Sequence, residues 1–146
     1  MHVLTKQIEE LYYPDIVAYF SNVSALLYEC LEDVNWVGFY FVKKDRLVLG
    51  PFQGKVACVE IAPGKGVCGK SLKEDRVILV ENVHEFEGHI ACDSASNSEI
   101  VLPVHKDNKV YALLDIDSPL LSRFKEEDRK LFIEVVEKIE EKIQAI

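Results

Sequence analysis

Two amphipathic segments that enclose a run of short alternating segments constrain the fold of this chain more than any other feature. From Pro14 to Asp33, apolar side chains recur at helical spacing, which predicts a helix with one buried face. From about Lys125 onwards a second stripe recurs at the same spacing, and residues 126–128 are acidic, which suits the positive end of a helix dipole. We expect a third, shorter helix within residues 1–12.

Between these helices, alternating side chains predict strands. Residues 35–42, NWVGFYFV, alternate so that every second side chain faces the core. A second strand is expected over residues 46–54, with an interruption at Gly50–Pro51. Further short strands are expected at ACVEI (57–61), VILV (77–80), EIVLPV (99–104) and VYALLDID (110–117). The polar turn HKDNK, residues 105–109, should join the last two as a hairpin.

A glycine-rich segment, residues 62–76, separates the strands and predicts a short helix from about Val67 to Asp75. Strands clustered between terminal helices favour the α+β class, with a mostly antiparallel sheet and the N- and C-terminal helices on one of its faces. The middle segment would then cover the other face and roof a ligand pocket. Because no repeat or linker interrupts the sequence, we expect residues 1–146 to form a single domain.

Charge and hydropathy exclude several functional classes. The chain is 49% hydrophobic and 29% charged, which is typical of an ordinary globular protein. Its net charge is −8 and its lysines are interleaved with glutamates, so we expect no nucleic acid or membrane partner. Neither a signal-peptide pattern nor an apolar run of roughly 20 residues is present, and we therefore expect a cytoplasmic protein.

Four cysteines are present, and thiols in that compartment are more often reduced, catalytic or metal-bound than structural. Cys30 lies on an apolar stripe, where we expect a small buried side chain without a role. Cys68 follows PGKGV at the start of a predicted helix, where free N–H groups would stabilise a thiolate and lower its pKa. Cys92 lies in the polar loop that opens GHIACDSASNSEIVLPV, residues 88–104. With Cys58 of ACVEI, these thiols permit a nucleophile and a resolving partner.

Two other interpretations of the thiols remain open from the sequence. The cysteines could be unrelated to one another, because spacing alone is weakly specific. A zinc site could include His84 and His89, although no Cys-x-x-Cys or His-x-x-x-His pair supports it.

Carboxylates and aromatic side chains form a second group of candidates. Asp115 and Asp117 lie two residues apart on one predicted strand and point to the same side, while Glu99 heads another strand. Burial of such acids is costly unless a cation pairs with them, but a strand end in solvent is an equal alternative. Trp36 and Tyr40 share one strand face, and beside the acids they would suit a small ligand with an ammonium and a methyl group. On their own, two aromatics on a strand are more often packing residues.

The motifs NWVGFY, LGPFQG, GVCG, GHIACDSASNSEIVLPV and LDIDSP occur in this order and cover most of residues 35–119. Together they resemble the free methionine-(R)-sulfoxide reductase family, whose members are enzymes built on a GAF domain. The resemblance is specific, because HIACDSASNSEIV is a long string of unusual composition and the cysteine positions agree with the family's spacing. It implies a GAF domain that is commonly a homodimer, with free methionine-(R)-sulfoxide as substrate and thioredoxin as reductant. We expect no cofactor and no metal.

The resemblance also implies roles for individual residues. Cys92 matches the nucleophilic cysteine, and Cys68 matches the cysteine that pairs with it in a disulfide. Cys58 matches a third redox-linked cysteine, and which of Cys58 and Cys68 resolves first stays open. Three acids match the positions that hold the substrate ammonium and act on the sulfoxide oxygen, and two aromatic residues match the wall around the substrate methyl. These are Glu99, Asp115 and Asp117, and Trp36 and Tyr40.

The expected reaction is reduction of free L-methionine-(R)-S-oxide through a cysteine sulfenic acid and an intramolecular disulfide. Crowded acids raise one another's pKa, so that a neutral carboxylic acid can protonate the sulfoxide oxygen. Glu99 is the first choice for this acid and Asp117 the second. The alternative function is a non-catalytic GAF module that senses a small ligand or the redox state.

Overall fold

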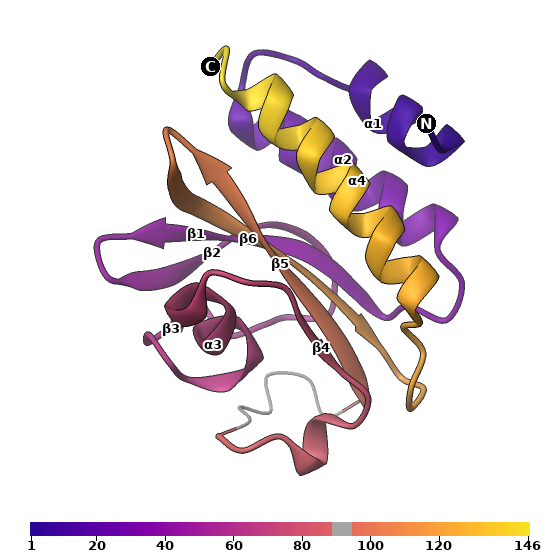
Figure 1. Cartoon of the computed structure of the whole chain (residues 1–146), viewed down its shortest axis with the longest axis vertical. Helices are drawn as coiled ribbons and strands as arrows, with labels where there is room; N and C mark the ends of the chain where they lie inside the picture. Colours follow the sequence, from indigo (N-terminus) through magenta and orange to yellow (C-terminus); the bar gives the residue numbers. More distant parts are fainter. Residues whose placement is uncertain (89–94) are drawn as a thin grey trace.

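The computed structural model describes residues 1–88 and 95–146, and these form a curled sheet with helices on both faces (Figure 1). The described helices are α1 (Val3–Glu10), α2 (Ile16–Cys30), α3 (Gly66–Glu74), the short 3-10 helix η1 (Val83–Glu85) and α4 (Glu126–Ile143). The described strands are β1 (Trp36–Lys43), β2 (Arg46–Gly54), β3 (Glu60–Ile61), β4 (Ile78–Val80), β5 (Ser98–Lys106) and β6 (Lys109–Ser118). Their order across the sheet is β3-β2-β1-β6-β5-β4, and every neighbouring pair is antiparallel.

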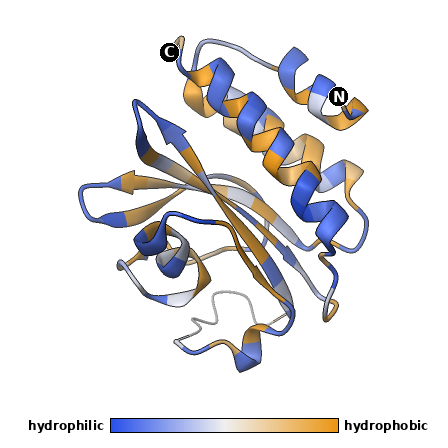
Figure 2. Ribbon diagram, viewed as in Figure 1, coloured by the Kyte–Doolittle hydropathy of each residue, from blue (hydrophilic) through white to orange (hydrophobic). Residues whose placement is uncertain are grey.

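The terminal helices cover one face of the sheet, as the two amphipathic stripes predict. Helices α2 and α4 pack on this face and α1 packs on α4 (Figure 1), and Figure 2 shows that hydrophobic and hydrophilic residues alternate along these helices. The apolar residues Phe20 of α2 and Phe132 of α4 are buried in the core against the sheet. Asp15 ends the irregular segment before α2, and its carboxylate accepts a hydrogen bond from the Ala18 N–H at 3.0 Å, a cap that contributes about 1 kcal/mol. The core beneath includes stacked Phe20 and Phe39 rings, 3.9 Å apart. The α+β architecture is therefore confirmed.

The second face of the sheet is covered by α3 and the segments that flank it (Figure 1). Val37 and Phe39 of β1 lie in the core under the terminal helices, whereas Trp36 and Tyr40 lie in a second apolar cluster on this other face. The predicted alternation along β1 is thus confirmed, but both sets of side chains are buried. No helix in residues 1–88 and 95–146 is long and apolar enough to cross a membrane.

Of three local predictions, two are confirmed with added detail and one needs correction. Strand β2 spans residues 46–54 as predicted, and the expected interruption at Gly50–Pro51 is a bulge that places these two residues opposite the single residue Phe39. The strand predicted at ACVEI is reduced to Glu60–Ile61, and the preceding residues 55–59 are irregular. The hairpin between β5 and β6 is confirmed, with Asp107 and Asn108 at φ of 54° and 63° in the left-handed region that a tight hairpin turn requires.

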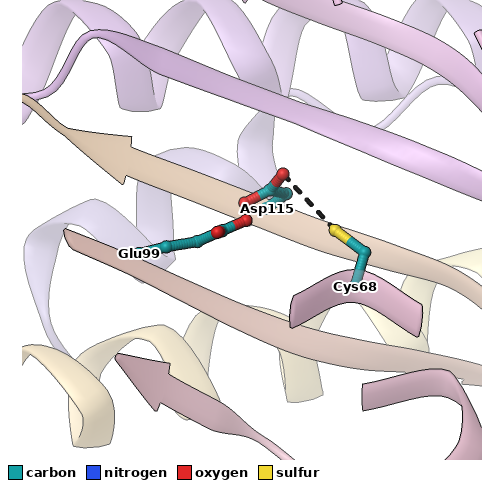
Figure 3. Close-up of side chains that lie close together, drawn as sticks. All are labelled: Cys68, Glu99 and Asp115. Carbon is teal, nitrogen blue, oxygen red and sulfur yellow. Dashed lines mark hydrogen bonds between the residues drawn. The ribbon is translucent and has the colours of Figure 1, made fainter. Parts of the chain in front are cut away.

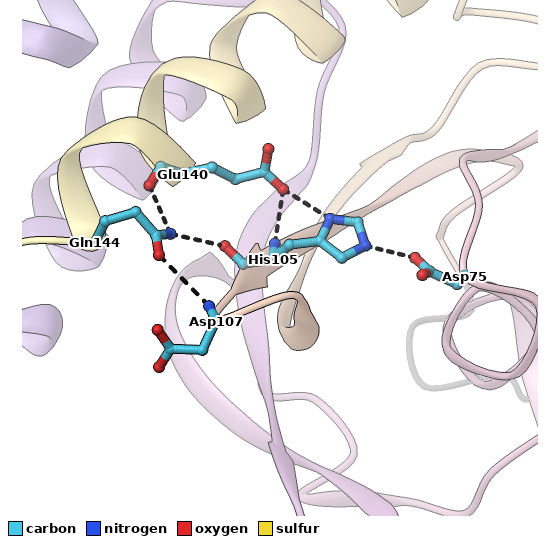
Figure 4. Close-up of polar contacts among 5 residues, drawn as sticks. All are labelled: Asp75, His105, Asp107, Glu140 and Gln144. Carbon is cyan, nitrogen blue, oxygen red and sulfur yellow. Dashed lines mark hydrogen bonds and ion pairs between the residues drawn. The ribbon is translucent and has the colours of Figure 1, made fainter.

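A histidine bridge joins α3, β5 and α4 on the outer surface (Figure 4). The two ring nitrogens of His105 lie 2.8 Å from a Glu140 carboxylate oxygen and 2.7 Å from an Asp75 carboxylate oxygen. Burial alone would lower the pKa of His105, but the hydrogen bonds with Glu140 and Asp75 outweigh it, so the pKa lies above its ordinary value of 6.5. The ring is therefore protonated more readily in the folded chain than in the unfolded one.

This bridge predicts a pH-dependent contribution to stability. A raised histidine pKa stabilises the fold fully below the unfolded-state pKa, and the effect is lost as pH rises through the folded-state pKa. We expect the His105→Gln variant to melt below the parent chain at about pH 5.5 and to approach it at about pH 9. Because the ring and Asp75 are partly exposed, solvent screening limits the effect to about 1 kcal/mol or less. Thermal melts at both pH values check this, and a gap that widened with rising pH would contradict it.

Candidate active site

Three carboxylates meet on the α3 face of the sheet, at one end of strands β5 and β6. The strand register places Glu99 directly opposite Asp117, and Asp115 one diagonal step away beside Val101. Residues two apart on a strand share a face, so Asp115 and Asp117 point to the same side. The exposed fractions of Glu99, Asp115 and Asp117 are 8%, 5% and 8%. The alternative of a strand end in solvent is therefore excluded.

Cys68 completes this cluster from the first turn of α3. Its thiol donates a hydrogen bond to the Asp115 Oδ2 atom at 3.4 Å (Figure 3). One ligand-type atom from each of Cys68, Glu99 and Asp115 lies within 4.8 Å of the other two, so the described residues that could hold a metal ion by distance are these three. His84 is not among them, and its Nε2 atom lies 2.8 Å from the Asn97 side-chain oxygen. His89, the other histidine of the zinc alternative, lies outside the described residues.

Burial dominates the protonation equilibria of the cluster. Burial and then the charge of Asp115 raise the pKa of Glu99 well above its ordinary value. Burial and then the charge of Asp117 do the same for the pKa of Asp115. Carboxyl groups in this position are held partly in the neutral form, and a neutral carboxylic acid can donate a proton.

The prediction of a lowered Cys68 pKa is wrong. Burial, followed by the negative charges of Asp115, Glu99 and Asp117, raises the pKa of the Cys68 thiol well above its ordinary value. The thiol does lie at a helix N-terminus, but desolvation and three nearby acids outweigh the helix dipole. Cys68 is therefore a neutral hydrogen-bond donor rather than a thiolate.

One carboxylate oxygen of Asp115 accepts no hydrogen bond from the described residues. This atom, Oδ1, is buried. A buried polar atom without a partner costs about 1–3 kcal/mol, and a ligand that brings a donor removes that cost. The cluster is thus suited to a small molecule with a cationic donor group.

Trp36 and Tyr40 lie beside these acids on β1. In the pairing of β1 with β6, Trp36 is opposite Asp117, and both aromatic side chains are only 2% exposed. Their rings are stacked with centroids 6.0 Å apart, and Phe52 extends the stack at 5.2 Å from Trp36. The two aromatics are therefore packing residues and also neighbours of the acids. Phe52 was not a candidate from the sequence, because the β2 bulge interrupts the alternation that would have revealed it.

The other cysteines differ in state and exposure. Cys58 is half-buried in the segment between β2 and β3, and it is disulfide-bonded, whereas Cys30 and Cys68 are free. The prediction of a buried Cys30 is wrong, since it is exposed at the end of α2, beyond Leu27, the last buried residue of that helix. Cys92 lies outside the described residues, within 89–94.

Comparisons with known proteins now define the class. The GAF domain family matches residues 5–143. This chain is 53% identical over 124 residues to the free methionine-R-sulfoxide reductase of Escherichia coli, and the aligned region covers 85% of this chain and 75% of that protein. The fold resembles fRMsr of Staphylococcus aureus in complex with substrate, with a TM-score of 0.92, 46% identity, and coverage of 97% and 94% of the two chains.

A second enzyme with bound substrate is also similar. The free methionine-R-sulfoxide reductase of Neisseria meningitidis superposes with a TM-score of 0.93 at 39% identity, over 97% of this chain and 87% of that chain. These matches make the chain a GAF-domain protein. Within that class it belongs to the free methionine-R-sulfoxide reductases, which are oxidoreductases, and the resemblance of its motifs is confirmed.

Proposed function

We propose that this chain reduces free L-methionine-(R)-S-oxide to L-methionine with electrons from its own thiols. The observation that carries this proposal is the buried cluster of Glu99, Asp115 and Cys68, in which one Asp115 oxygen has no described partner. An amino-acid ammonium group supplies the donor and the positive charge that the cluster needs. Two similar enzymes were solved in complex with substrate, which supports the choice of free methionine sulfoxide as the ligand.

Substrate binding follows from the charges of the site. We assign Asp115 and Asp117 to the ammonium group, because pairing with a cation offsets the cost of keeping carboxylates out of water. We assign Trp36 and Tyr40 to the wall against the methyl end of the ligand, since their rings lie on the same face as the acids. A free amino acid is the fitting substrate class, because the site recognises the ammonium group that a peptide bond would consume.

Reduction then requires an acid and a nucleophile. Glu99, whose raised pKa favours the neutral form, donates a proton to the sulfoxide oxygen and makes the sulfur more electrophilic. Cys92 attacks the sulfur, the oxygen passes to the Cys92 sulfur as sulfenic acid, and methionine leaves as the neutral thioether. The substrate is reduced by two electrons and Cys92 is oxidised by two.

We assign the resolving step to Cys58. Its thiol attacks the sulfenic sulfur of Cys92, an S–S bond forms, the S–O bond breaks, and water leaves. The disulfide-bonded state of Cys58 and the free, buried thiol of Cys68 support this order over one in which Cys68 resolves first. Cys68 then acts as a hydrogen-bond donor to Asp115.

We further propose thioredoxin as the dithiol that reduces the disulfide, a homodimeric assembly, and a cytoplasmic location.

A direct assay tests the proposed function. The purified chain is incubated with dithiothreitol and either the R or the S epimer of free methionine sulfoxide, and methionine is measured by chromatography. We expect repeated turnover of the R epimer and none of the S epimer. If neither epimer yields methionine above a heat-denatured control, the chain is not a free methionine sulfoxide reductase.

A further inference from the structure

The segment that carries Cys58 has little regular structure of its own. Residues 55–59 join β2 to β3 without helix or strand geometry, and Val56 and Val59 in this segment are 87% and 68% exposed. A cysteine on such a segment reaches another sulfur efficiently only if the surrounding backbone is held in place. The groups that hold this backbone therefore bear on the resolving step.

Two buried aromatic side chains donate hydrogen bonds to this segment. The Tyr40 hydroxyl donates to the Cys58 carbonyl oxygen at 2.9 Å, and the Trp36 indole N–H donates to the Lys55 carbonyl oxygen at 3.0 Å. The Leu49 backbone N–H adds a third tether to the Val59 carbonyl at 2.9 Å. The Tyr40 bond is the closest of the three to the reactive sulfur, because it ends on the backbone of Cys58 itself.

The rings that provide these donors are themselves fixed. Trp36 lies between Tyr40 and Phe52 in the aromatic stack. It also fits closely against two glycines, since a Cβ atom on Gly38 would lie 2.7 Å from the indole and one on Gly54 would lie 2.6 Å from it. A side chain at either glycine would displace the indole. The donors are thus held rigidly on β1, at the centre of the sheet.

We propose that Tyr40 and Trp36 are positioning residues for Cys58, which hold its segment where the thiol can resolve the sulfenic acid. The inference deepens the proposed function and rests on it for the role of Cys58. It gives the two aromatics a second role, because the same side chains that are assigned to the wall against the substrate methyl also place the redox cysteine. The Tyr40 hydroxyl and the Trp36 N–H hold the segment by hydrogen bonds, whereas the ring faces contact the substrate.

The test compares two tyrosines that make the same kind of bond. Tyr40→Phe removes only the hydroxyl that holds Cys58, and Tyr19→Phe removes a hydroxyl that donates to the Ile8 carbonyl at 3.0 Å in the opposite core. Each change removes one hydrogen bond from a tyrosine hydroxyl to a backbone carbonyl and leaves the ring in place. A general loss of stability affects both variants, while loss of positioning affects only Tyr40→Phe.

The first measurement is the equilibrium potential of the Cys58 disulfide in dithiothreitol buffers, followed by alkylation and mass spectrometry. With Tyr40→Phe, we expect disulfide formation to be about tenfold less favourable, which raises the potential by about 30 mV. Tyr19→Phe should match the parent chain. Trp36→Phe, which loses the bond to the Lys55 carbonyl, should shift the potential in the same direction as Tyr40→Phe. Equal potentials for Tyr40→Phe and Tyr19→Phe would overturn the proposal.

The second measurement is kinetic. After one addition of sulfoxide to reduced protein, the rate of disulfide formation divided by the rate of methionine release should fall in Tyr40→Phe and stay constant in Tyr19→Phe. An unchanged ratio in Tyr40→Phe would also overturn the positioning role. If the parent chain releases no methionine, the proposed function fails, and the disulfide potentials still decide whether the hydroxyl positions Cys58.

Discussion

Replacement of Cys92 by serine is expected to reduce methionine release from free methionine-(R)-sulfoxide by roughly 10⁴-fold or more. A serine hydroxyl has nearly the size of the thiol, but it is a far weaker nucleophile and cannot form a stable sulfenic acid. The mechanism requires the Cys92 sulfur to receive the sulfoxide oxygen, so no other described thiol should replace it. Cys68 in particular is buried and its pKa is raised, which disfavours the thiolate.

The measurement is single-turnover methionine release from the reduced variant, followed by chromatography. Cys30→Ser is the matched control, because Cys30 is a free and exposed thiol at the end of α2. The control should retain the activity of the parent chain. Near-normal release by Cys92→Ser would show that the nucleophile has been assigned to the wrong cysteine.

Replacement of Glu99 by glutamine should lower the rate of methionine release by roughly 10²–10⁴-fold, the usual contribution of a general acid. Glutamine has the shape of the acid and can still donate a hydrogen bond, but it cannot transfer a proton to the sulfoxide oxygen. Glu60→Gln is a suitable control, since Glu60 is exposed and pairs with Arg46 on the surface. Full activity of Glu99→Gln, measured at saturating sulfoxide, would exclude Glu99 as the proton donor.

The same variant should be more stable than the parent chain at neutral pH. Because burial raises the folded-state pKa of Glu99, its ionisation disfavours the fold, and stability falls as pH rises above the ordinary value of 4.5 towards the folded-state pKa. Glutamine stays neutral throughout this range. The gain in melting temperature should therefore be largest near neutral pH and shrink towards pH 4.5. This trade between stability and activity is typical of a functional residue.

Periodicity in the sequence predicts much of this fold because it records which faces are buried. The stripes of the terminal helices, the alternation of β1 and the Asp107–Asn108 turn all reappear in the structure. The shared face of Asp115 and Asp117 was also predictable, because strand geometry alone determines it. Local rules were sufficient wherever the structure depends on neighbours in the sequence.

Features that depend on distant partners could not be predicted in this way. The interruption at Gly50–Pro51 was predicted, but its form as a bulge opposite Phe39 depends on the pairing of β2 with β1. The raised pKa of the Cys68 thiol depends on acids more than thirty residues away. The tether between Tyr40 and the Cys58 carbonyl likewise joins residues that are separated by 18 positions. Each of these required the three-dimensional arrangement of the strands around the site.

Stoichiometry in the absence of any reductant tests the central claim most directly. Fully reduced protein receives excess free methionine-(R)-sulfoxide, and methionine, remaining thiols and disulfide-linked peptides are measured together. We predict one methionine per chain, the loss of two of the four thiols, and a disulfide that joins Cys58 to Cys92. Methionine release without loss of thiols, or no release at all, would contradict the idea that buried acids and a pair of thiols in one pocket carry out the reduction.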